Sequence, residues 1–571
     1  MKRMYSTDEA YAILASDSDI TNTASDFDPD QYSDTDSVIS DNVTDNVTEA
    51  PESVPRSPPP KRPATAPEST GDGATWVPPN ATYPEIPPFS ADPGVNLDVA
   101  NFTPIQYLNI FLGDDIMQVI ATHTNLYAAQ YLASHPRSYI AKSNRWYPTD
   151  TTELKKFWAL TLCMGIIKKP TLRSYWSKDP VLETPIFSHS MKRVRYEMLL
   201  RFLHFSDNSI CPPKDHPSYD RLYKIRPLIT HLQTKFAEAY TPQRNIAIDE
   251  SLMKFKGRLG FKQYIPSKKS RYGIKFYKLC ESGSGYTWAF RVYEGKDSHL
   301  DPPGCPDFLG TSAKIVWELL IPLLGKGYHL YLDNFYTSVP LFRILYCLDT
   351  VACGTIRKNR KGFPKELSDK RLTRGATSAL RQEELLAVKF RDKKDVLMIT
   401  TIHDESTIPV TVRGKAEMLR KPVCIKAYNK HMGGVDLSDQ LLQPYLAIRK
   451  TRAWYKKVAI YMMHIATYNS YILFRKNSPG KIPSFLQYQL NIIKGILPHQ
   501  APATVRTTVR TEHFIFKIPP TPKKAKPQRR CRVCSRKGKR TDTIYHCPDC
   551  PAQPALCLGT CFKEFHLAAN L

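Results

Sequence analysis

The chain has 571 residues, of which 42% are hydrophobic and 11% aromatic, so it can form a sizeable core and has room for about four domain-sized units. No apolar run reaches the roughly 18 residues of a membrane-spanning helix, and the N-terminus lacks a signal-peptide pattern, which excludes a membrane-spanning protein and argues against a secreted one. The net charge is +26 although residues 1–60 carry 13 acids and 3 bases, so the remainder is basic enough to suit a polyanionic partner.

Residues 1–95 are rich in Ser, Asp, Thr and Pro and poor in aliphatic side chains, which predicts a disordered acidic N-terminal region. From residue 96 to 244 apolar side chains recur at intervals of three and four residues, as at Ile105 and Leu108 and again at Leu154 and Phe157. This spacing predicts a helical domain.

Residues 245–357 change to the pattern of strands. The sequence predicts strands at 245–249, 276–279 and 287–293, a helix at 313–324, a strand at 328–332, a helix at 339–348 and a strand at 351–356. This is the element order of an RNase H-like fold. We therefore expect a multidomain α/β protein with an RNase H-like core.

Three aspartates stand at positions that can hold them rigidly. Asp249 ends the first predicted strand, Asp333 ends the fourth, and Asp436 follows a glycine pair at a predicted helix start. A single aspartate at a strand end is more often a turn or cap residue. Three converging carboxylates, however, can bind two Mg²⁺ ions roughly 3.5–4 Å apart for phosphodiester chemistry, which indicates a nuclease or a transposase. Glu250 is expected to point to the other side of its strand, away from the metal.

Residues 358–422 are basic and rich in loops, with a few predicted strands that include 387–390 and 396–401, and helical spacing returns from 442 to 500. Arg357, Lys358, Arg360 and Lys361 form a basic run just past the fifth predicted strand, where a solvated loop is the default interpretation. A linker rich in Pro and Lys, 517–530, precedes the last unit.

Six of the 13 cysteines lie between Cys531 and Cys561, and His566 follows them. Two Cys-x2-Cys pairs at this separation are typical of zinc ligands, and the further ligands indicate a second zinc in a cross-brace. One ion would be held by Cys531, Cys534, Cys557 and Cys561, and the other by Cys547, Cys550 and His566. A RING-like ubiquitin ligase is an alternative that the upstream aspartates disfavour.

The segment around these cysteines carries eleven bases and no acid between Lys517 and Arg540. That density suits phosphate contact and nuclear import alike, and it makes Arg529, Arg530 and Arg532 candidate DNA contacts.

Several motifs follow one another along the chain: Ala-Ile-Asp-Glu-Ser-Leu, Leu-Asp-Asn-Phe-Tyr-Thr-Ser, Tyr-Asn-Lys-His-Met-Gly-Gly-Val-Asp and Thr-Arg-Ala-Trp-Tyr-Lys-Lys. From about residue 95 to the C-terminus the sequence resembles the piggyBac family of DNA transposases, and within it the vertebrate Uribo-type members. The fullest family pattern has a further zinc ligand near position 569, which is Ala569 here. The second zinc would then need His546, Asp549 or water.

The resemblance implies a role for most of the residues singled out above. Asp249, Asp333 and Asp436 match the family's three catalytic aspartates, which bind Mg²⁺, and Asp439 matches a fourth acid one helical turn later. The basic run at 357–361 would lie along DNA. Trp454 matches a family tryptophan near the active site, which would stack on an extruded base or pack in the core.

The resemblance also implies a domain plan. Residues 245–357 and 423–441 would form the catalytic domain, with 358–422 inserted in it, and 96–244 and 442–516 would form a dimerisation and DNA-binding domain. Residues 531–571 would form a cysteine-rich zinc-binding domain that binds the transposon's terminal repeats. The implied activity is cut-and-paste transposition in the nucleus, by a homodimer, through hairpin intermediates into TTAA targets. The alternative is a domesticated DNA- or chromatin-binding descendant without catalytic activity.

Overall fold

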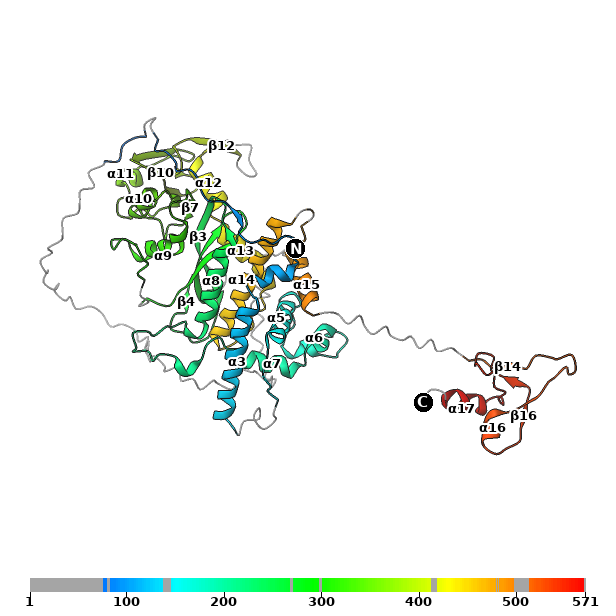
Figure 1. Cartoon of the computed structure of the whole chain (residues 1–571). Coiled ribbons are helices and arrows are strands. Elements are labelled where there is room, and N and C mark those ends of the chain that lie inside the picture. Colours follow the sequence, from blue (N-terminus) through cyan, green and yellow to red (C-terminus); the bar gives the residue numbers. More distant parts are fainter. Residues whose placement is uncertain are drawn as a thin grey trace, which may run out of the picture. The chain divides into compact units, whose positions relative to one another are not determined.

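The structure is a computed structural model, and it describes residues 75–79, 83–136, 145–266, 271–296, 300–411, 418–478, 480, 482–497 and 513–568. The chain divides into two compact units, Met1–Leu497 and Pro498–Leu571, which Figure 1 shows. Among the described residues, no helix combines the length and the apolar character that crossing a bilayer requires.

The first unit is built around a mixed β-sheet. Five of its strands lie in the order β6-β5-β3-β7-β8, with β3 antiparallel to β5 and parallel to β7. The elements are β3 (Asn245–Lys254), β5 (Tyr272–Glu281), β6 (Thr287–Val292), α9 (Thr311–Leu320), β7 (His329–Leu332), α10 (Val339–Cys347) and β8 (Val351–Thr355). Their order along the chain and their pairing confirm the predicted RNase H-like core.

Side chains that alternate along the strands form a core on each face of this sheet. Ile248 and Leu330 belong to the main core, to which α10 contributes Phe342. Their neighbours Ala247 and Tyr331 point the other way and pack in a second cluster with residues of α12 (Val423–His431). Because both faces are covered, these strands are apolar on both sides, as parallel strands in α/β proteins are.

The predicted insertion, 358–422, adds three strands to the same sheet. β8 pairs antiparallel with β11 (Asp395–Thr400), which continues to β10 (Leu385–Arg391) and β9 (Thr377–Gln382). The predicted strands 387–390 and 396–401 coincide with β10 and β11. The hairpin of β12 (Thr407–Thr411) and β13 (Met418–Pro422) forms a separate small sheet before α12.

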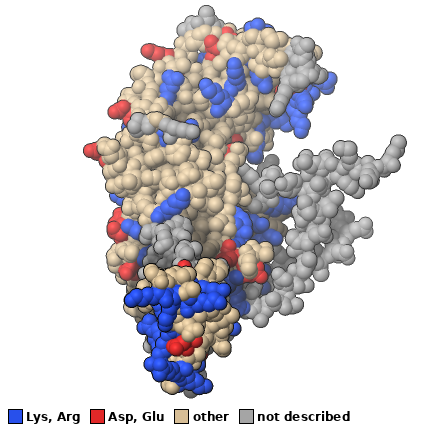
Figure 2. Space-filling view, turned by 90° about the vertical axis from the view of Figure 1, so that its right-hand side faces the viewer, with Lys and Arg blue, Asp and Glu red and all other residues tan. Residues whose placement is uncertain are grey.

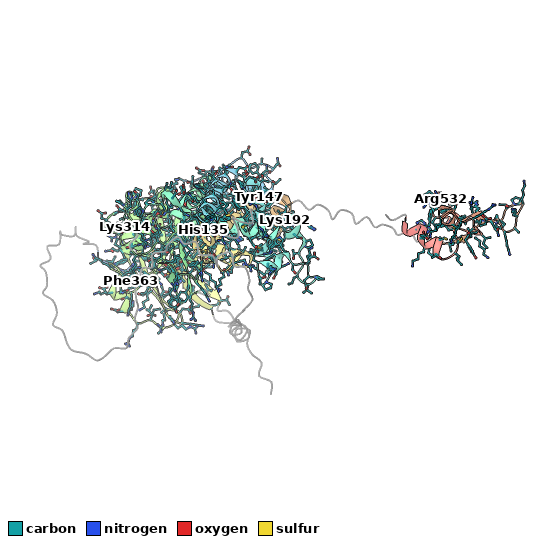
Figure 3. The ribbon with its side chains drawn as sticks, turned by 90° about the horizontal axis from the view of Figure 1, so that it is seen from below. His135, Tyr147, Lys192, Lys314, Phe363 and Arg532 are labelled. Atoms are coloured by element: carbon teal, nitrogen blue, oxygen red, sulfur yellow. The ribbon has the colours of Figure 1, made fainter. Side chains whose placement is uncertain are left out.

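The helices before β3 and after α13 (Gly434–Leu442) pack together although they are far apart in sequence. α14 and α15 both contact α2, and the Tyr488 hydroxyl donates to the Pro104 carbonyl at 3.2 Å. In the same unit the Arg195 guanidinium lies 3.6 Å from the ring centroid of Tyr147, which Figure 3 labels. The main helices are α2 (Pro104–Asn109), α3 (Asp114–Ser134), α5 (Thr151–Ile166), α7 (Arg193–Phe202), α8 (Arg226–Ala239), α14 (Trp454–Asn477) and α15 (Phe485–Ile496).

Part of the predicted disordered region, 1–95, packs against the sheet. Residues 1–74 lie outside the described residues, but Val77 exchanges backbone hydrogen bonds with Arg381 at the edge strand β9. The Trp76 indole donates to the Gly362 carbonyl at 3.1 Å, and the Phe89 ring packs edge-on against Tyr328 at 5.0 Å. These aromatic side chains anchor residues 75–79 and 83–95 to the first unit. The prediction missed them because it rested on the average composition of residues 1–95.

The second unit is small and has little apolar core. Its short strands pair as β14 (Phe516–Lys517) with β17 (Tyr545–His546) and β15 (Arg529–Arg530) with β16 (Asp542–Thr543). Its buried cluster consists of Cys531, Val533, Cys547 and Leu556, against which the other four cysteines of the unit pack. Because β14 precedes the predicted start of this domain at Cys531, the folded unit includes the segment predicted as a linker.

Candidate functional site

Two of the predicted acids meet at one edge of the sheet. β3 and β7 run parallel with Ile248 opposite Leu332, so Asp249 and Asp333, the next residue on each strand, emerge side by side. The carboxylates of Asp249, Asp333 and Glu250 all lie within 4.8 Å of one another. Three carboxylates at this spacing form a donor set of hard oxygens, which fits Mg²⁺.

The position of Glu250 differs from the prediction. Strand alternation places its Cβ on the face opposite Asp249, yet its carboxylate reaches the same group. β7 ends at Leu332, opposite Ile248, so Glu250 has no neighbouring residue of β7 beside it. Its long side chain can therefore reach around the end of β7 to the carboxylates of Asp249 and Asp333. The Tyr336 hydroxyl donates to Glu250 Oε2 at 3.4 Å. Glu250 is therefore a neighbour of the site that the period-two rule alone misses.

The Asp333 carboxyl is held by the turn that follows it. The Phe335 N–H donates to Asp333 Oδ1 at 2.9 Å, and the Thr337 hydroxyl donates to the Asp333 carbonyl at 2.8 Å. Burial raises the pKa of Asp333 and the Glu250 carboxylate raises it further, whereas the Phe335 N–H and Arg357 act in the opposite direction. A cation would relieve this crowding of buried negative charge.

The third predicted aspartate lies on a helix beside these strands. α13 packs against β3 and β5, and Asp436 stands in its first turn with an exposed side chain. Gly434 allows this close packing, because a Cβ there would lie 3.0 Å from the Glu281 carbonyl oxygen. Among the described residues, the group of carboxylates within 4.8 Å does not include Asp436.

Asp439 is bound to the sheet. Its Oδ1 accepts hydrogen bonds from the Ser251 hydroxyl and from the Lys278 ammonium, each at 2.9 Å. Ser251 follows Asp249 by two residues on β3, so the two side chains share a face. Asp439 thus links the helix of Asp436 to the strand of Asp249.

The basic run after β8 borders the Asp333 turn. The Arg357 Nε donates to Asn334 Oδ1 at 3.0 Å, and Arg360 donates to the Asn334 carbonyl at 3.0 Å. Lys358 and Lys361 are exposed. The two arginines therefore support the turn beside Asp333, while the lysines face solvent.

Trp454 begins α14 and is half-buried. Its ring packs edge-on against Phe261 at 5.3 Å. This contact gives it a packing role, and the partly exposed ring also remains accessible to a base.

The second unit gathers its metal-ligating side chains in two groups. Cys531, Cys534, Cys557 and Cys561 form one group within 4.8 Å, with the Cys534 and Cys561 sulfurs 3.6 Å apart. Burial raises the pKa of Cys531, but backbone N–H groups outweigh it and lower this pKa to about 7, which favours the thiolate that metals bind.

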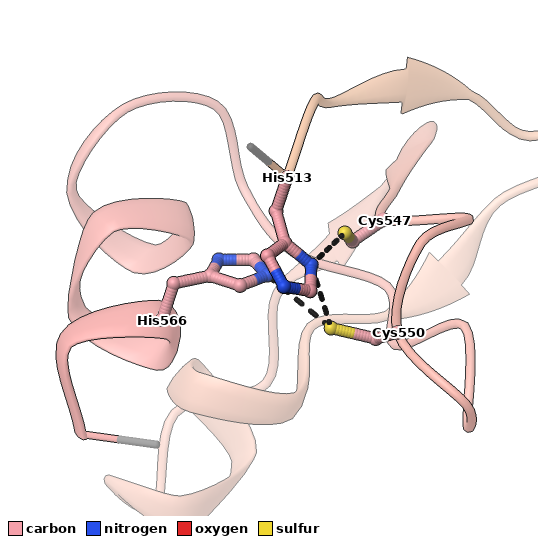
Figure 4. Close-up of side chains that lie close together, drawn as sticks. All are labelled: His513, Cys547, Cys550 and His566. Carbon is pink, nitrogen blue, oxygen red and sulfur yellow. Dashed lines mark hydrogen bonds between the residues drawn. The ribbon is translucent and has the colours of Figure 1, made fainter. Parts of the chain in front are cut away.

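The other group contains Cys547, Cys550 and His566, and its fourth member is His513 (Figure 4). The His513 Nδ1 lies 3.4 Å from both sulfurs, and His566 Nε2 lies 3.3 Å from Cys550. His566 Nδ1 donates to the Phe562 carbonyl at 2.7 Å, so Nε2 is the ring nitrogen that can ligate a metal. Two thiolates and two imidazoles at these distances fit tetrahedral zinc.

Neither His546 nor Asp549 joins these two groups of described residues. Asp549 instead accepts the Phe514 N–H at 3.1 Å and so holds the segment next to His513. No clear sequence signal marks His513, because it precedes the cysteines without a regular spacing. The pairing of β14 with β17 brings it to the group.

Figure 2 shows Lys and Arg crowded on the second unit, in the lower part of the view. Arg529, Arg530 and Arg532 are all exposed there, and the Arg532 guanidinium, labelled in Figure 3, lies 5.9 Å from the Phe565 ring centroid. Such a surface suits contact with phosphates.

Two families match successive parts of this chain. The family described as "Transposase IS4" matches residues 103–471, and "DDE_Tnp_1-like zinc finger" matches residues 516–567. The solved piggyBac transposase synaptic complex with hairpin DNA has a similar fold, with a TM-score of 0.63 and 23% identity over 82% of this chain and 98% of that chain.

Relatives in Homo sapiens carry the same family name. The piggyBac transposable element-derived proteins 3 and 2 are each 26% identical, over 412 and 408 residues, or 68% of this chain and 64% of theirs. Protein 5 is 21% identical over 450 residues, 75% of this chain and 81% of its own. The match thus spans about 64% of the length of the first two. With most of the chain matched by the transposase family and its zinc finger, the chain belongs to the piggyBac transposase family.

Proposed function

We propose that this chain is a cut-and-paste DNA transposase that uses Asp249, Asp333 and Asp436 as its catalytic acids. The observation that carries the proposal is the convergence of Asp249 and Asp333 at the edge of an RNase H-like sheet, with the helix of Asp436 packed on the same strand. Family membership supports the chemistry, since a transposase family matches residues 103–471.

The three aspartates would hold two Mg²⁺ ions, with Asp439 positioned next to them. When bound, such ions activate a water or a 3′-hydroxyl for attack and stabilise the leaving oxygen. The chain's own contribution is geometric: the β3–β7 pairing fixes Asp249 and Asp333, and Arg357 and Arg360 support the turn after Asp333.

The proposed path consists of repeated in-line attacks at phosphorus. Water first hydrolyses one strand at each transposon end and frees a 3′-hydroxyl. This hydroxyl attacks the opposite strand, which closes a hairpin and releases the flanking DNA. Water then opens the hairpin, and the 3′-ends join a TTAA target in the nucleus. Because two ends must be held together, the acting form is a homodimer.

The zinc module would bind the transposon's terminal repeats. We assign one Zn²⁺ to Cys531, Cys534, Cys557 and Cys561, and a second to the group of Cys547, Cys550, His566 and His513. Arg529, Arg530 and Arg532 would contact phosphates. In the first unit Lys358 and Lys361 would contact DNA, together with Arg357, Arg360 and Trp454.

A second candidate is a DNA- or chromatin-binding descendant without catalysis. It is favoured by one observation, the position of Asp436 outside the close group of carboxylates. In this case the zinc module and the basic residues would still bind DNA, but the acids would not cleave it.

A plasmid excision assay distinguishes the two candidates, with the element's own ends flanked by TTAA and the donor junctions sequenced. We expect footprint-free junctions from the wild type and roughly 10³-fold fewer or none from Asp333→Asn, with DNA-end binding retained. Asp349→Asn is a matched control, because Asp349 is exposed, precedes β8 at the opposite end of the parallel strands and has a φ of 47° that asparagine tolerates. Equal excision by Asp333→Asn and wild type would refute the catalytic assignment.

A further inference from the structure

A fully buried lysine lies on the strand next to that of the first proposed catalytic aspartate. Lys278 on β5 is in register with Asp249 on β3, and its side chain is 0% exposed. A buried ammonium is costly unless it is paired and hydrogen-bonded. Burial lowers the pKa of Lys278, but Asp439 and Tyr461 outweigh this and raise it above the ordinary value, so the ammonium stays charged.

Four elements meet at this lysine. Its Nζ lies 2.9 Å from Asp439 Oδ1 on α13 and 2.9 Å from the Tyr461 hydroxyl on α14. The Ser251 hydroxyl on β3 lies 2.9 Å from each of the same two groups. Lys278 and Ser251 therefore hold one carboxylate oxygen of Asp439 against β5 and β3. Tyr461 connects the cluster to α14.

This cluster lies between the proposed catalytic residues on the strand and on the helix. Ser251 is two residues from Asp249, and Asp439 is one helical turn from Asp436. α13 also approaches the sheet closely through its backbone: a Cβ at Gly434 would lie 3.0 Å from the Glu281 carbonyl oxygen, and one at Gly285 would lie 3.0 Å from the Ser438 nitrogen. Such approaches define how near the helix lies to the sheet, and the ion pair of Asp439 with the buried Lys278 also fixes the rotation and register of the helix.

We infer that Lys278 is a positioning residue, which acts through Asp439 to set the place of Asp436 relative to Asp249 and Asp333. The inference rests on the proposed function and assigns Asp439 a part in it. Asp439 is the partner of the lysine and does not itself ligate the active-site cation. The charge of Lys278 also offsets that of Asp439 next to a site already crowded with carboxylates.

The test is a charge-cancelling double substitution in the full chain. Lys278→Met leaves Asp439 charged without its partner, and Asp439→Asn leaves the lysine buried and unpaired. Lys278→Met combined with Asp439→Asn removes both charges, while the asparagine Oδ1 can still accept from Ser251. The readouts are Mn²⁺ affinity by electron paramagnetic resonance without DNA, amide hydrogen exchange of residues 434–442, and excision.

We expect each single substitution to weaken Mn²⁺ binding by about 10-fold or more, the scale of changes beside a metal ligand, and to speed exchange in α13. The double variant should return to within about 3-fold of the wild type in Mn²⁺ affinity. Lys389→Met is the matched control: Lys389 is also buried in the sheet and paired with Asp395 at 3.2 Å, but on β10. It should lower stability without changing Mn²⁺ affinity.

Two results would overturn the inference. A double variant as weak in Mn²⁺ binding as Asp439→Asn alone would show that Asp439 is itself a ligand. Wild-type affinity and exchange in Lys278→Met would show that the lysine positions nothing. If the wild type excises no DNA, the proposed function fails, while the Mn²⁺ affinities and exchange rates still decide the role of Lys278.

Discussion

Replacement of His513 by alanine should remove one zinc ion from the second unit and leave the other. His513 Nδ1 lies 3.4 Å from the sulfurs of both Cys547 and Cys550, so it supplies one of four ligands to this group. The all-cysteine group shares none of these residues, and its affinity should be unchanged.

The size of the effect follows from the ligand count and from the small core. Loss of a residue that merely orients a ligand typically costs 10–100-fold in metal affinity, so loss of a direct ligand should cost at least about 100-fold, or about 2.7 kcal/mol. Among the described residues, the unit's largest buried cluster has only Val533 and Leu556 as fully buried apolar side chains besides its cysteines. Because so small a core depends on metal, the loss should also loosen the β14–β17 pairing next to His513.

Native mass spectrometry of the full chain under increasing chelator should show two zinc ions in the wild type and one in His513→Ala. Co²⁺ substitution gives an independent spectrum, in which the band of the mixed sulfur–nitrogen site should fade and that of the all-sulfur site should stay. His513→Cys should restore the second ion, because a thiolate can replace the imidazole.

His546→Asn is the matched control. His546 is buried in the adjacent strand but lies outside both ligand groups, so this variant should keep two zinc ions. The reasoning would be refuted if His513→Ala retained both ions, and most clearly if His546→Asn lost one instead.

Three further predictions concern the first unit. Glu281 is paired with Lys476 at 2.8 Å. Burial acts to raise the pKa of Glu281, but the Gln243 N–H and Lys476 outweigh it and lower this pKa. The stabilisation by ionised Glu281 is therefore present above about pH 4 and is lost as pH falls through the lowered pKa. Glu281→Gln should therefore lower the unfolding free energy by about 2 kcal/mol at pH 7, and urea titrations should show the difference shrinking below about pH 4. Gly165→Ala should cost about 3 kcal/mol in the same titration, because its Cβ would collide with the Tyr445 carbonyl oxygen; a change below about 0.5 kcal/mol would contradict the packing. Lys361→Ala should reduce the salt dependence of DNA binding by about one phosphate contact, measured by anisotropy at several salt concentrations, and an unchanged slope would remove this exposed lysine from the DNA contacts.

Much of the RNase H-like core could be predicted from sequence because apolar side chains recur with a different period in its strands and in its helices. Alternation marked β3, and short apolar runs marked β7 and β8, so the places of Asp249 and Asp333 followed from the strand ends. The pairing of β11 with β8 was not predictable in this way, since a loop-rich stretch, 358–376, hides the continuity of the sheet. The prediction that residues 1–95 are disordered rested on their composition, and it missed the contacts of Trp76 with Gly362 and of Phe89 with Tyr328.

The site residues that escaped prediction depend on contacts between distant segments. Glu250 was left out of the group because alternation places its Cβ on the face opposite Asp249, whereas its longer side chain reaches the other carboxylates beyond the end of β7. His513 joins its group through a pairing of two-residue strands that leaves no periodic trace. The Lys278–Asp439 pair joins a strand to a helix more than 150 residues away, and neither residue type indicates burial.

The two halves of the proposed active site are therefore fixed by different kinds of interaction. Asp249 and Asp333 are placed by the β3–β7 backbone pairing, which must form for the sheet to exist. Asp436 is placed by the packing of α13, an arrangement that a few side chains decide. Backbone pairing allows little adjustment, whereas the place of a helix packed on a sheet depends on side-chain contacts such as that of Lys278 with Asp439. Substitutions around α13 should for this reason change metal affinity and catalysis more than they change the stability of the sheet.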